Sequence, residues 1–117
     1  MTSNYSRPRH KTRPARLFLN DMEVGVVSVR GQSGSWSFGE FVPSSQFSDF
    51  APVFAQWSLL MHAEPADGRL NPTVSERLRA AEYQIDALRA SLVLDNPGER
   101  HQLRQLNIDR GLIEWKQ

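Results

Sequence analysis

The densest apolar segment of the chain runs from Ser35 to Trp57 and reads SWSFGEFVPSSQFSDFAPVFAQW. It holds five of the six phenylalanines and two of the three tryptophans of a chain of 117 residues. Its first part alternates apolar and polar residues as a strand does, and its second part repeats apolar residues at helical spacing. A strand that leads into a helix buries both apolar faces only if the helix folds back onto the sheet. We therefore expect a helix packed on a sheet.

The residues before this segment predict a β-meander. The runs ARLFLN and MEVGVVSVR are rich in strand-forming residues, and Asn20–Asp21 between them fits a tight hairpin turn. The apolar alternation of Val24 and Val26 changes phase at Val27, which predicts a bulge near Gly25–Val27 or a strand buried on both faces. The run WSFGEF, with Trp36 and Phe38 on one face, predicts a third strand that ends at Pro43.

The second part of the aromatic segment predicts a helix that ends between Glu64 and Gly68. Asp49 is a fair N-cap, and Pro52 lies in the first turn, where its missing N–H has no intrahelical partner to lose. The apolar residues that follow at spacings of three and four are Phe50, Phe54, Trp57, Leu60 and Met61.

A second helix is predicted from Pro72 onward. Asn71 is the expected cap, and proline is favoured at the first helical position. Apolar residues then recur at spacings of three and four over more than four turns, which is typical of an amphipathic helix. They are Val74, Leu78, Ala81, Ile85, Leu88 and Leu92.

The end of the chain predicts a hairpin. Pro97 and Gly98 form a turn signal, HQLRQLNI and LIEWKQ are the two expected strands, and Gly111 supplies the positive φ of the turn between them. The predicted order is β-β-β-α-α-β-β. This order is typical of an α+β domain in which two helices pack on one face of an antiparallel sheet of about five strands.

Charge divides the chain into a basic arm and an acidic body. Residues 1–16 carry Arg7, Arg9, Lys11, Arg13 and Arg16 and no acid, whereas the other nine basic residues face thirteen acids, which leaves the body at −4. Pro8 and Pro14 forbid a continuous helix. We expect a disordered arm over residues 1–14 and a single domain over residues 15–117.

The aromatic side chains themselves are expected to form the core. A surface that stacks nucleic-acid bases needs Lys or Arg among its aromatic residues, and the segment from Ser35 to Trp57 contains neither. Phe41 and Phe47 flank the loop at Pro43 and leave two interpretations open. They either close the edge of the core or form an exposed apolar patch that contacts a partner protein.

The succession of an early hairpin, the strand end WSFGEFVP, an aromatic helix and the terminal LNIDRGLIEWKQ resembles a group of small bacterial proteins of unassigned function. The resemblance spans most of residues 15–117. It implies an α+β fold and carries no activity, so it transfers no site residue.

Residue patterns that carry catalytic or metal chemistry are missing. The chain has no cysteine, which excludes disulfides and thiolate chemistry. Its three histidines have no metal-binding spacing, although a site shared by His62 and His101 stays open, and its glycines and serines match no phosphate loop and no nucleophile elbow. We predict a protein that is not an enzyme and needs no metal and no cofactor.

Two functional hypotheses follow. The first is a protein-interaction module that binds another protein or a second copy of itself through Phe41, Phe47 or a sheet edge; an inhibitor of a basic enzyme is a special case. The second is weak, salt-sensitive association with nucleic acid through the five cations of the arm. No apolar run reaches the roughly 18 residues of a membrane helix, and residues 1–16 lack a signal peptide's apolar core. We expect a cytoplasmic protein without membrane contact.

Overall fold

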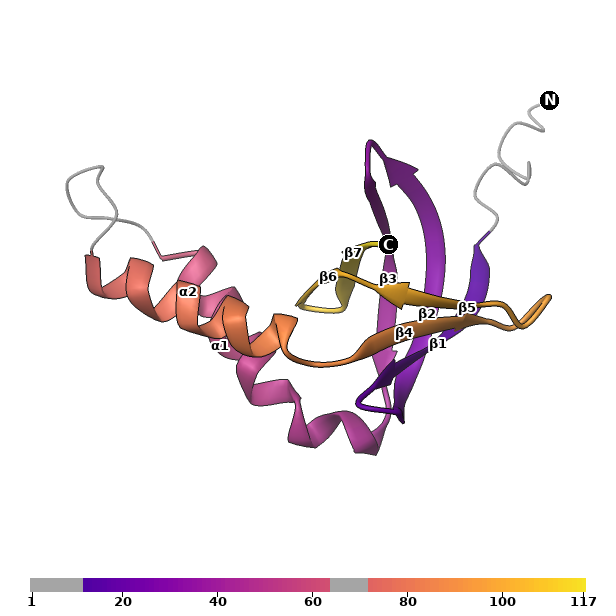
Figure 1. The fold of residues 1–117 in the computed structure, drawn as a ribbon, viewed down its shortest axis with the longest axis horizontal. Helices are drawn as coiled ribbons and strands as arrows, with labels where there is room; N and C mark the ends of the chain where they lie inside the picture. Colours follow the sequence, from indigo (N-terminus) through magenta and orange to yellow (C-terminus); the bar gives the residue numbers. More distant parts are fainter. Residues whose placement is uncertain (1–11, 64–71) are drawn as a thin grey trace, which may run out of the picture.

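The computed structural model describes residues 12–63 and 72–117. Within them the chain forms seven strands, two α-helices and one short 3₁₀ helix (Figure 1). In chain order these are β1 (Arg13–Leu19), β2 (Met22–Ser33), β3 (Trp36–Pro43), η3 (Ser45–Asp49), α1 (Ala51–Met61), α2 (Pro72–Asp86), β4 (Ala90–Leu94), β5 (Arg100–Leu103), β6 (Gln105–Asp109) and β7 (Leu112–Lys116).

The first three strands form the predicted meander. Asn20 and Asp21 have φ values of 51° and 68°, as a two-residue type I′ turn between antiparallel strands requires. The register between β1 and β2 shifts at Val24: Leu17 pairs with Gly25 and Phe18 with Glu23, so Val24 is the extra residue on β2. This bulge turns both Val24 and Val27 into the interior, which explains the phase change in the sequence.

The sheet has seven strands in the order β5-β4-β1-β2-β3-β7-β6, and all of its pairs are antiparallel. The α+β class and the two helices are confirmed, but the expected number of about five strands is wrong. The second helix ends at Asp86, and Leu92 lies on β4 rather than on the helix. All five residues of β4 are buried, and Ser91 is the one polar residue among them, so the run lacks the alternation that separates a strand from a helix.

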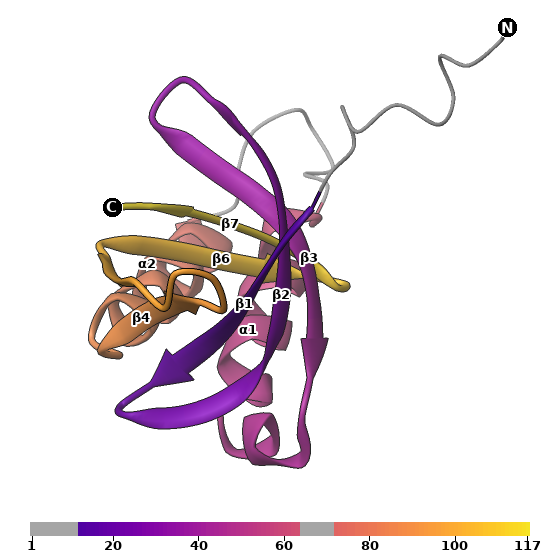
Figure 2. The same cartoon turned by 90° about the vertical axis from the view of Figure 1, so that its right-hand side faces the viewer.

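The other additional strand comes from a bend in the penultimate run. The stretch HQLRQLNI divides at Arg104 into β5, which pairs with β4, and β6, which pairs with β7. The two edge strands of the sheet are therefore consecutive in the chain and joined by one residue. The sheet coils into a barrel-like shape, with the long strands β1 to β3 curving around β6 and β7 (Figure 2).

The interior of the coiled sheet and the helices share one core. Its largest fully buried side chains include Leu17, Leu92, Ile113 and Trp115. The two helices pack against each other and against β6, and as a pair they extend to one side of the sheet (Figure 1). Phe54 and Trp57 join the core from α1, as expected.

The prediction that Trp36 and Phe38 face the core is wrong. Phe38 is 41% exposed and Trp36 is half-buried, because β3 turns Gly39 and Phe41 inward instead. A Cβ at position 39 would collide with the carbonyl oxygen of Ser28. Glycine thus lets the backbones of β2 and β3 approach closely where the sheet coils, a reason that alternation alone does not reveal.

Candidate functional site: a hollow between the first helix and the last hairpin

A hollow of about 460 Å³ opens between α1, η3, the end of β3 and the β6–β7 turn. Most of its lining is carbon, and Arg110 is the single charged side chain among the described residues that form it. We call it the apolar hollow; it is lined by Phe41, Pro43, Phe47, Ala51, Phe54, Ala55, Ser58, Leu59, Ile108, Arg110 and Gly111.

Three phenylalanines form its inner wall. The rings of Phe41 and Phe47 meet edge to face with centroids 5.0 Å apart, and those of Phe47 and Phe54 lie 5.7 Å apart. Phe41 and Phe47 are 4% and 9% exposed, so they do not form the exposed patch that one interpretation required. Their positions agree with the alternative, in which they close the edge of the core.

The loop before α1 holds Phe47 in this position. The predicted cap at Asp49 is wrong: the chain first makes η3, and Ser44 caps that helix by accepting a hydrogen bond from the backbone N–H of Gln46 at 3.2 Å. The Ser44 N–H donates to the Val24 carbonyl at 2.8 Å, which ties the loop to β2. The helix α1 then begins with Pro52 in its first turn, as expected.

The β6–β7 turn forms the opposite side of the hollow. Arg110 and Gly111 have φ values of 54° and 84°, again a type I′ turn, and this confirms the predicted role of Gly111. The Phe41 N–H donates to the Gly111 carbonyl at 2.8 Å, so the turn is fixed to β3. The Arg110 side chain is 77% exposed and stands at the rim.

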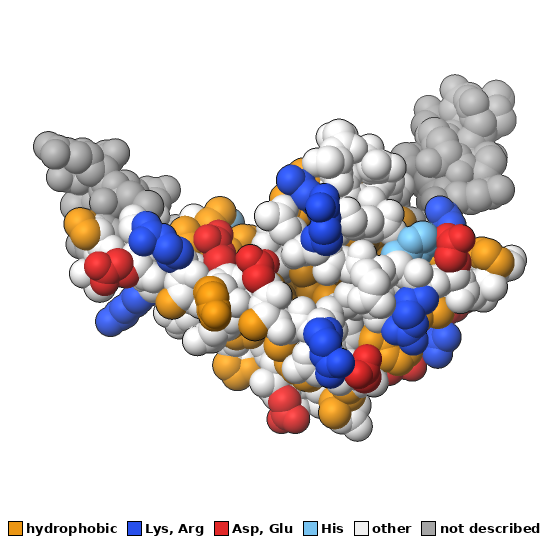
Figure 3. Space-filling view, in the orientation of Figure 1, with side chains coloured by type: hydrophobic (Ala, Val, Ile, Leu, Met, Phe, Trp, Pro, Cys, Tyr) orange, Lys and Arg blue, Asp and Glu red, His pale blue; other side chains and the backbone are white. Residues whose placement is uncertain are grey.

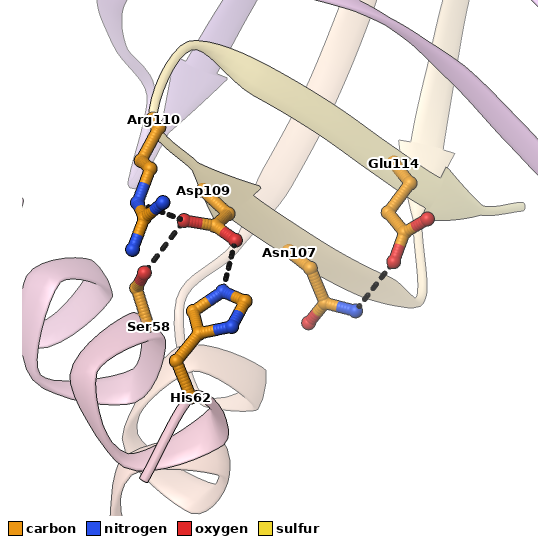
Figure 4. A network of polar contacts seen from close by, with 6 residues as sticks. All are labelled: Ser58, His62, Asn107, Asp109, Arg110 and Glu114. Atoms are coloured by element: carbon orange, nitrogen blue, oxygen red, sulfur yellow. Dashed lines mark hydrogen bonds and ion pairs between the residues drawn. The ribbon is translucent and has the colours of Figure 1, made fainter.

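A polar network fastens this turn to α1 (Figure 4). The Asp109 carboxylate accepts a hydrogen bond from Ser58 Oγ at 2.6 Å through one oxygen, and its other oxygen lies 2.8 Å from His62 Nε2. These two contacts, that with His62 foremost, hold the pKa of Asp109 below its usual range. Glu114, in the same view, accepts a bond from Asn107 at 3.3 Å between β6 and β7.

The order of these groups differs from that of a hydrolytic triad. A Ser-His-Asp triad places the imidazole between serine and carboxylate, so that the imidazole can take the serine proton. Here the carboxylate of Asp109 lies between Ser58 and His62 (Figure 4). Its lowered pKa makes Asp109 a weaker base than an ordinary carboxylate. The arrangement serves to anchor the hairpin, and sequence reasoning missed it because its members lie 47 and 51 residues apart.

Asp109 of this network also lines a second hollow of about 370 Å³. The other residues of its lining are Phe38, Gly39, Trp57, Asn107, Leu112, Ile113 and Glu114. Leu112 pairs with Glu40 across the strands, so it lies diagonal to Phe38 and Val42 on the outer face of the sheet. All three side chains are exposed. Exposed apolar residues therefore gather on this outer face, while Leu59 stands at the rim of the apolar hollow.

The histidines do not come together in one site. His62 contacts Asp109, whereas His101 pairs with Glu99 at 2.8 Å at the mouth of the coiled sheet. In residues 12–63 and 72–117, no three His, Asp or Glu side chains are grouped so that they could hold a metal ion.

Of the five cations assigned to the arm, Arg7, Arg9 and Lys11 lie outside the described residues. Arg13 and Arg16 belong to β1, which begins two residues before the expected domain boundary. Arg16 lies 3.5 Å from both Glu23 and Asp95, so acids offset its charge. On the face shown in Figure 3, basic and acidic side chains are interspersed. Association with nucleic acid stays a prediction.

Comparison with protein-family models finds no match, and comparisons with curated proteins and with solved structures find none either. The resemblance to small bacterial proteins thus stays a prediction. Neither α1 nor α2, the two α-helices of the described residues, has the length and apolar character needed to cross a membrane.

Proposed function

We propose that the protein is an interaction module that receives apolar side chains of a partner protein in the apolar hollow. The observation that carries this proposal is an apolar hollow of about 460 Å³ that is backed by three buried phenylalanines and has an exposed aliphatic side chain at its rim. Leu59 at that rim is 70% exposed, although it lies on a helix whose other face belongs to the core. An aromatic pocket beside exposed apolar residues is a frequent centre of binding energy in protein interfaces.

The construction of the hollow supports this proposal. Its walls come from four separate elements, and hydrogen bonds hold all of them: Ser44 fixes η3, the bond from Phe41 N–H to the Gly111 carbonyl joins β3 to the hairpin turn, and Ser58 fixes α1. A pre-formed pocket costs a ligand less ordering entropy than a surface that must rearrange. Its volume lies within the range of ordinary binding pockets.

The polar contacts favour binding over catalysis. Ser58 and His62 are engaged by a single carboxylate with a lowered pKa, and the remaining lining of the hollow is apolar except for Arg110. We assign the network a structural role: it fixes the position of the hairpin turn relative to α1 and so sets the width of the hollow.

Photo-crosslinking in the native cells tests the proposal. A photoreactive amino acid replaces Leu59 at the rim, and the matched control carries it at Tyr83, which is 76% exposed on α2. We expect a discrete cross-linked protein from position 59 that is absent from position 83 and is lost when Ala55 in the lining is changed to Trp. Identical products from both positions, or products that survive Ala55→Trp, would contradict the proposed function.

A further inference from the structure

We infer that the segment that enters the apolar hollow carries a carboxylate next to its apolar anchor and pairs that carboxylate with Arg110. This inference rests on the proposed function and specifies the chemistry of the partner: an acidic, apolar stretch of another protein. It is drawn from the charge of the lining, the free donors of Arg110 and the position of its side chain.

The charge of the lining is the first argument. Of the described residues around the hollow, Arg110 alone is charged, and Ser58 is the only other polar side chain. The Ser58 hydroxyl already donates to Asp109 at 2.6 Å. The nearby carboxylate of Asp109 lies 3.7 Å from Arg110 but lines the second hollow and not this one. Within the apolar hollow a cationic ligand would therefore meet a like charge, whereas an anionic ligand meets one cation beside aromatic carbon.

The donors of Arg110 are the second argument. Its single ion pair among the described residues joins Nε to Asp109 Oδ1 at 3.7 Å, which is longer than an N–H···O hydrogen bond. That Oδ1 already accepts the short bond from Ser58, and the other carboxylate oxygen faces His62. The guanidinium thus keeps donors that can bind a carboxylate in a fork, the geometry in which Arg pairs most strongly with acids.

The position of Arg110 is the third argument. Its backbone is set by the type I′ turn and by the bond from Phe41 N–H to the Gly111 carbonyl, so its side chain starts from a fixed point at the rim. Its neighbours Ile108 and Gly111 line the hollow. A partner residue that inserts beside Phe41 and Phe54 therefore brings an adjacent acidic residue within reach of the guanidinium.

Selection from a phage-displayed random-peptide library on the full-length protein tests this inference. Parallel selections use Arg110→Glu, Ala55→Trp, which fills the hollow, and the control Arg89→Glu. Arg89 is 71% exposed and its ion pair joins it to Asp21, away from the hollow. Thermal unfolding first establishes that each variant is folded.

We expect the wild type and Arg89→Glu to enrich peptides in which an aromatic or aliphatic residue adjoins Asp or Glu. Arg110→Glu should enrich Lys or Arg at the same place, and Ala55→Trp should enrich neither kind. A peptide selected on the wild type should bind Arg110→Gln about tenfold more weakly, as expected for the loss of one charge-assisted contact at an exposed rim.

Two results separate the inference from the proposed function. Apolar peptides without charge preference that are lost in Ala55→Trp would overturn the inference and leave the proposed function standing. Peptides unaffected by Ala55→Trp would place binding elsewhere and overturn both.

Other occupants would overturn the inference in distinct ways. A library without enrichment together with binding of decanoate that Arg110→Gln weakens would make the hollow a site for small amphiphiles. A dimer of the purified protein that Ala55→Trp dissociates would make the occupant a second copy. A library without enrichment and no binding of decanoate would leave Arg110 without an acidic ligand.

Discussion

Asp109 holds two partners from α1 with one carboxylate, and its lowered pKa makes this contact dependent on pH. The pKa of an Asp in an unfolded chain is about 3.9. The pKa of Asp109 in the folded protein is lower, so the ionised carboxylate stabilises the folded state. That contribution is complete above about pH 5, shrinks as the pH falls below about 4, and is lost below the folded pKa. We expect wild type to exceed Asp109→Asn in free energy of unfolding by a constant amount near neutral pH, and this difference to narrow in acid.

Urea denaturation at a series of pH values measures the difference. Ser58→Ala is the companion variant. It removes one of the groups that lower the pKa of Asp109, which are His62, Ser58 and Arg110, so its free energy of unfolding should fall less steeply in acid than that of the wild type. If the free energies of unfolding of wild type and Asp109→Asn change in parallel with pH, the charge of the carboxylate contributes nothing to stability.

Among the glycines of the described residues, Gly39 leaves the least room for a Cβ atom. We expect Gly39→Ala to lower the free energy of unfolding by about 1–3 kcal/mol, the usual cost of overpacking, because its Cβ would meet the backbone of Ser28. Gly31→Ala is the control, since its Cβ would meet only the tip of the Phe38 ring, which can move. Equal melting temperatures for the two variants would contradict this account.

At the scale of elements, η3 depends on one side chain. Phe47 is the buried residue of this short helix and stands between Phe41 and Phe54. We expect Phe47→Ala to cost about 3–5 kcal/mol, as buried Phe→Ala changes do, and to enlarge the apolar hollow. Phe38→Ala, at an exposed position on β3, should cost about 1 kcal/mol or less. Chemical denaturation measures both, and similar losses would mean that η3 is not held by Phe47.

Local signals predicted the elements whose chemistry is local. The turns at Asn20–Asp21 and Gly111, the bulge after Val24 and the start of α2 at Pro72 follow from residue types that few other conformations accept. The strand β4 was missed because a fully buried strand has no polar face. The division at Arg104 was missed because no Gly or Pro marks the bend.

The candidate site was harder to predict than the elements. Alternation along β3 indicated two faces but not which one is buried, so Phe38 was assigned to the core, while Phe41 was left between the edge of the core and an exposed contact patch. Which face of β3 is buried depends on the side toward which the sheet coils and the helices pack, and local alternation does not carry that information. The Ser58–Asp109–His62 contacts have the same origin, because they depend on how the last hairpin meets α1.

At the scale of the whole molecule, a single residue, Arg104, links the two edge strands β5 and β6 of the coiled sheet. The Arg104 N–H donates to the Lys116 carbonyl at 2.8 Å, and its side chain makes an exposed bond to the carbonyl of Gln117. We expect Arg104→Pro to lower the free energy of unfolding by about 1–3 kcal/mol, because it removes the backbone donor and leaves a carbonyl without its partner. Arg104→Ala loses only the exposed bond and should cost well under half as much. Equal costs in thermal unfolding would show that the backbone bond at the bend does not matter.

Arg13, where the first strand begins, and Gln117, the last residue, line the same hollow at the mouth of the coiled sheet. The order in which the chain visits its strands can therefore be changed without moving any of them. A short Gly-Ser linker from Gln117 to Thr12, with new ends at the exposed Gly34–Ser35 turn, gives a circularly permuted chain. In such a chain β2 and β3 would lie at opposite ends of the sequence and still pair in space. The same fold would then form from a different order of strands, because the contacts between the strands determine it.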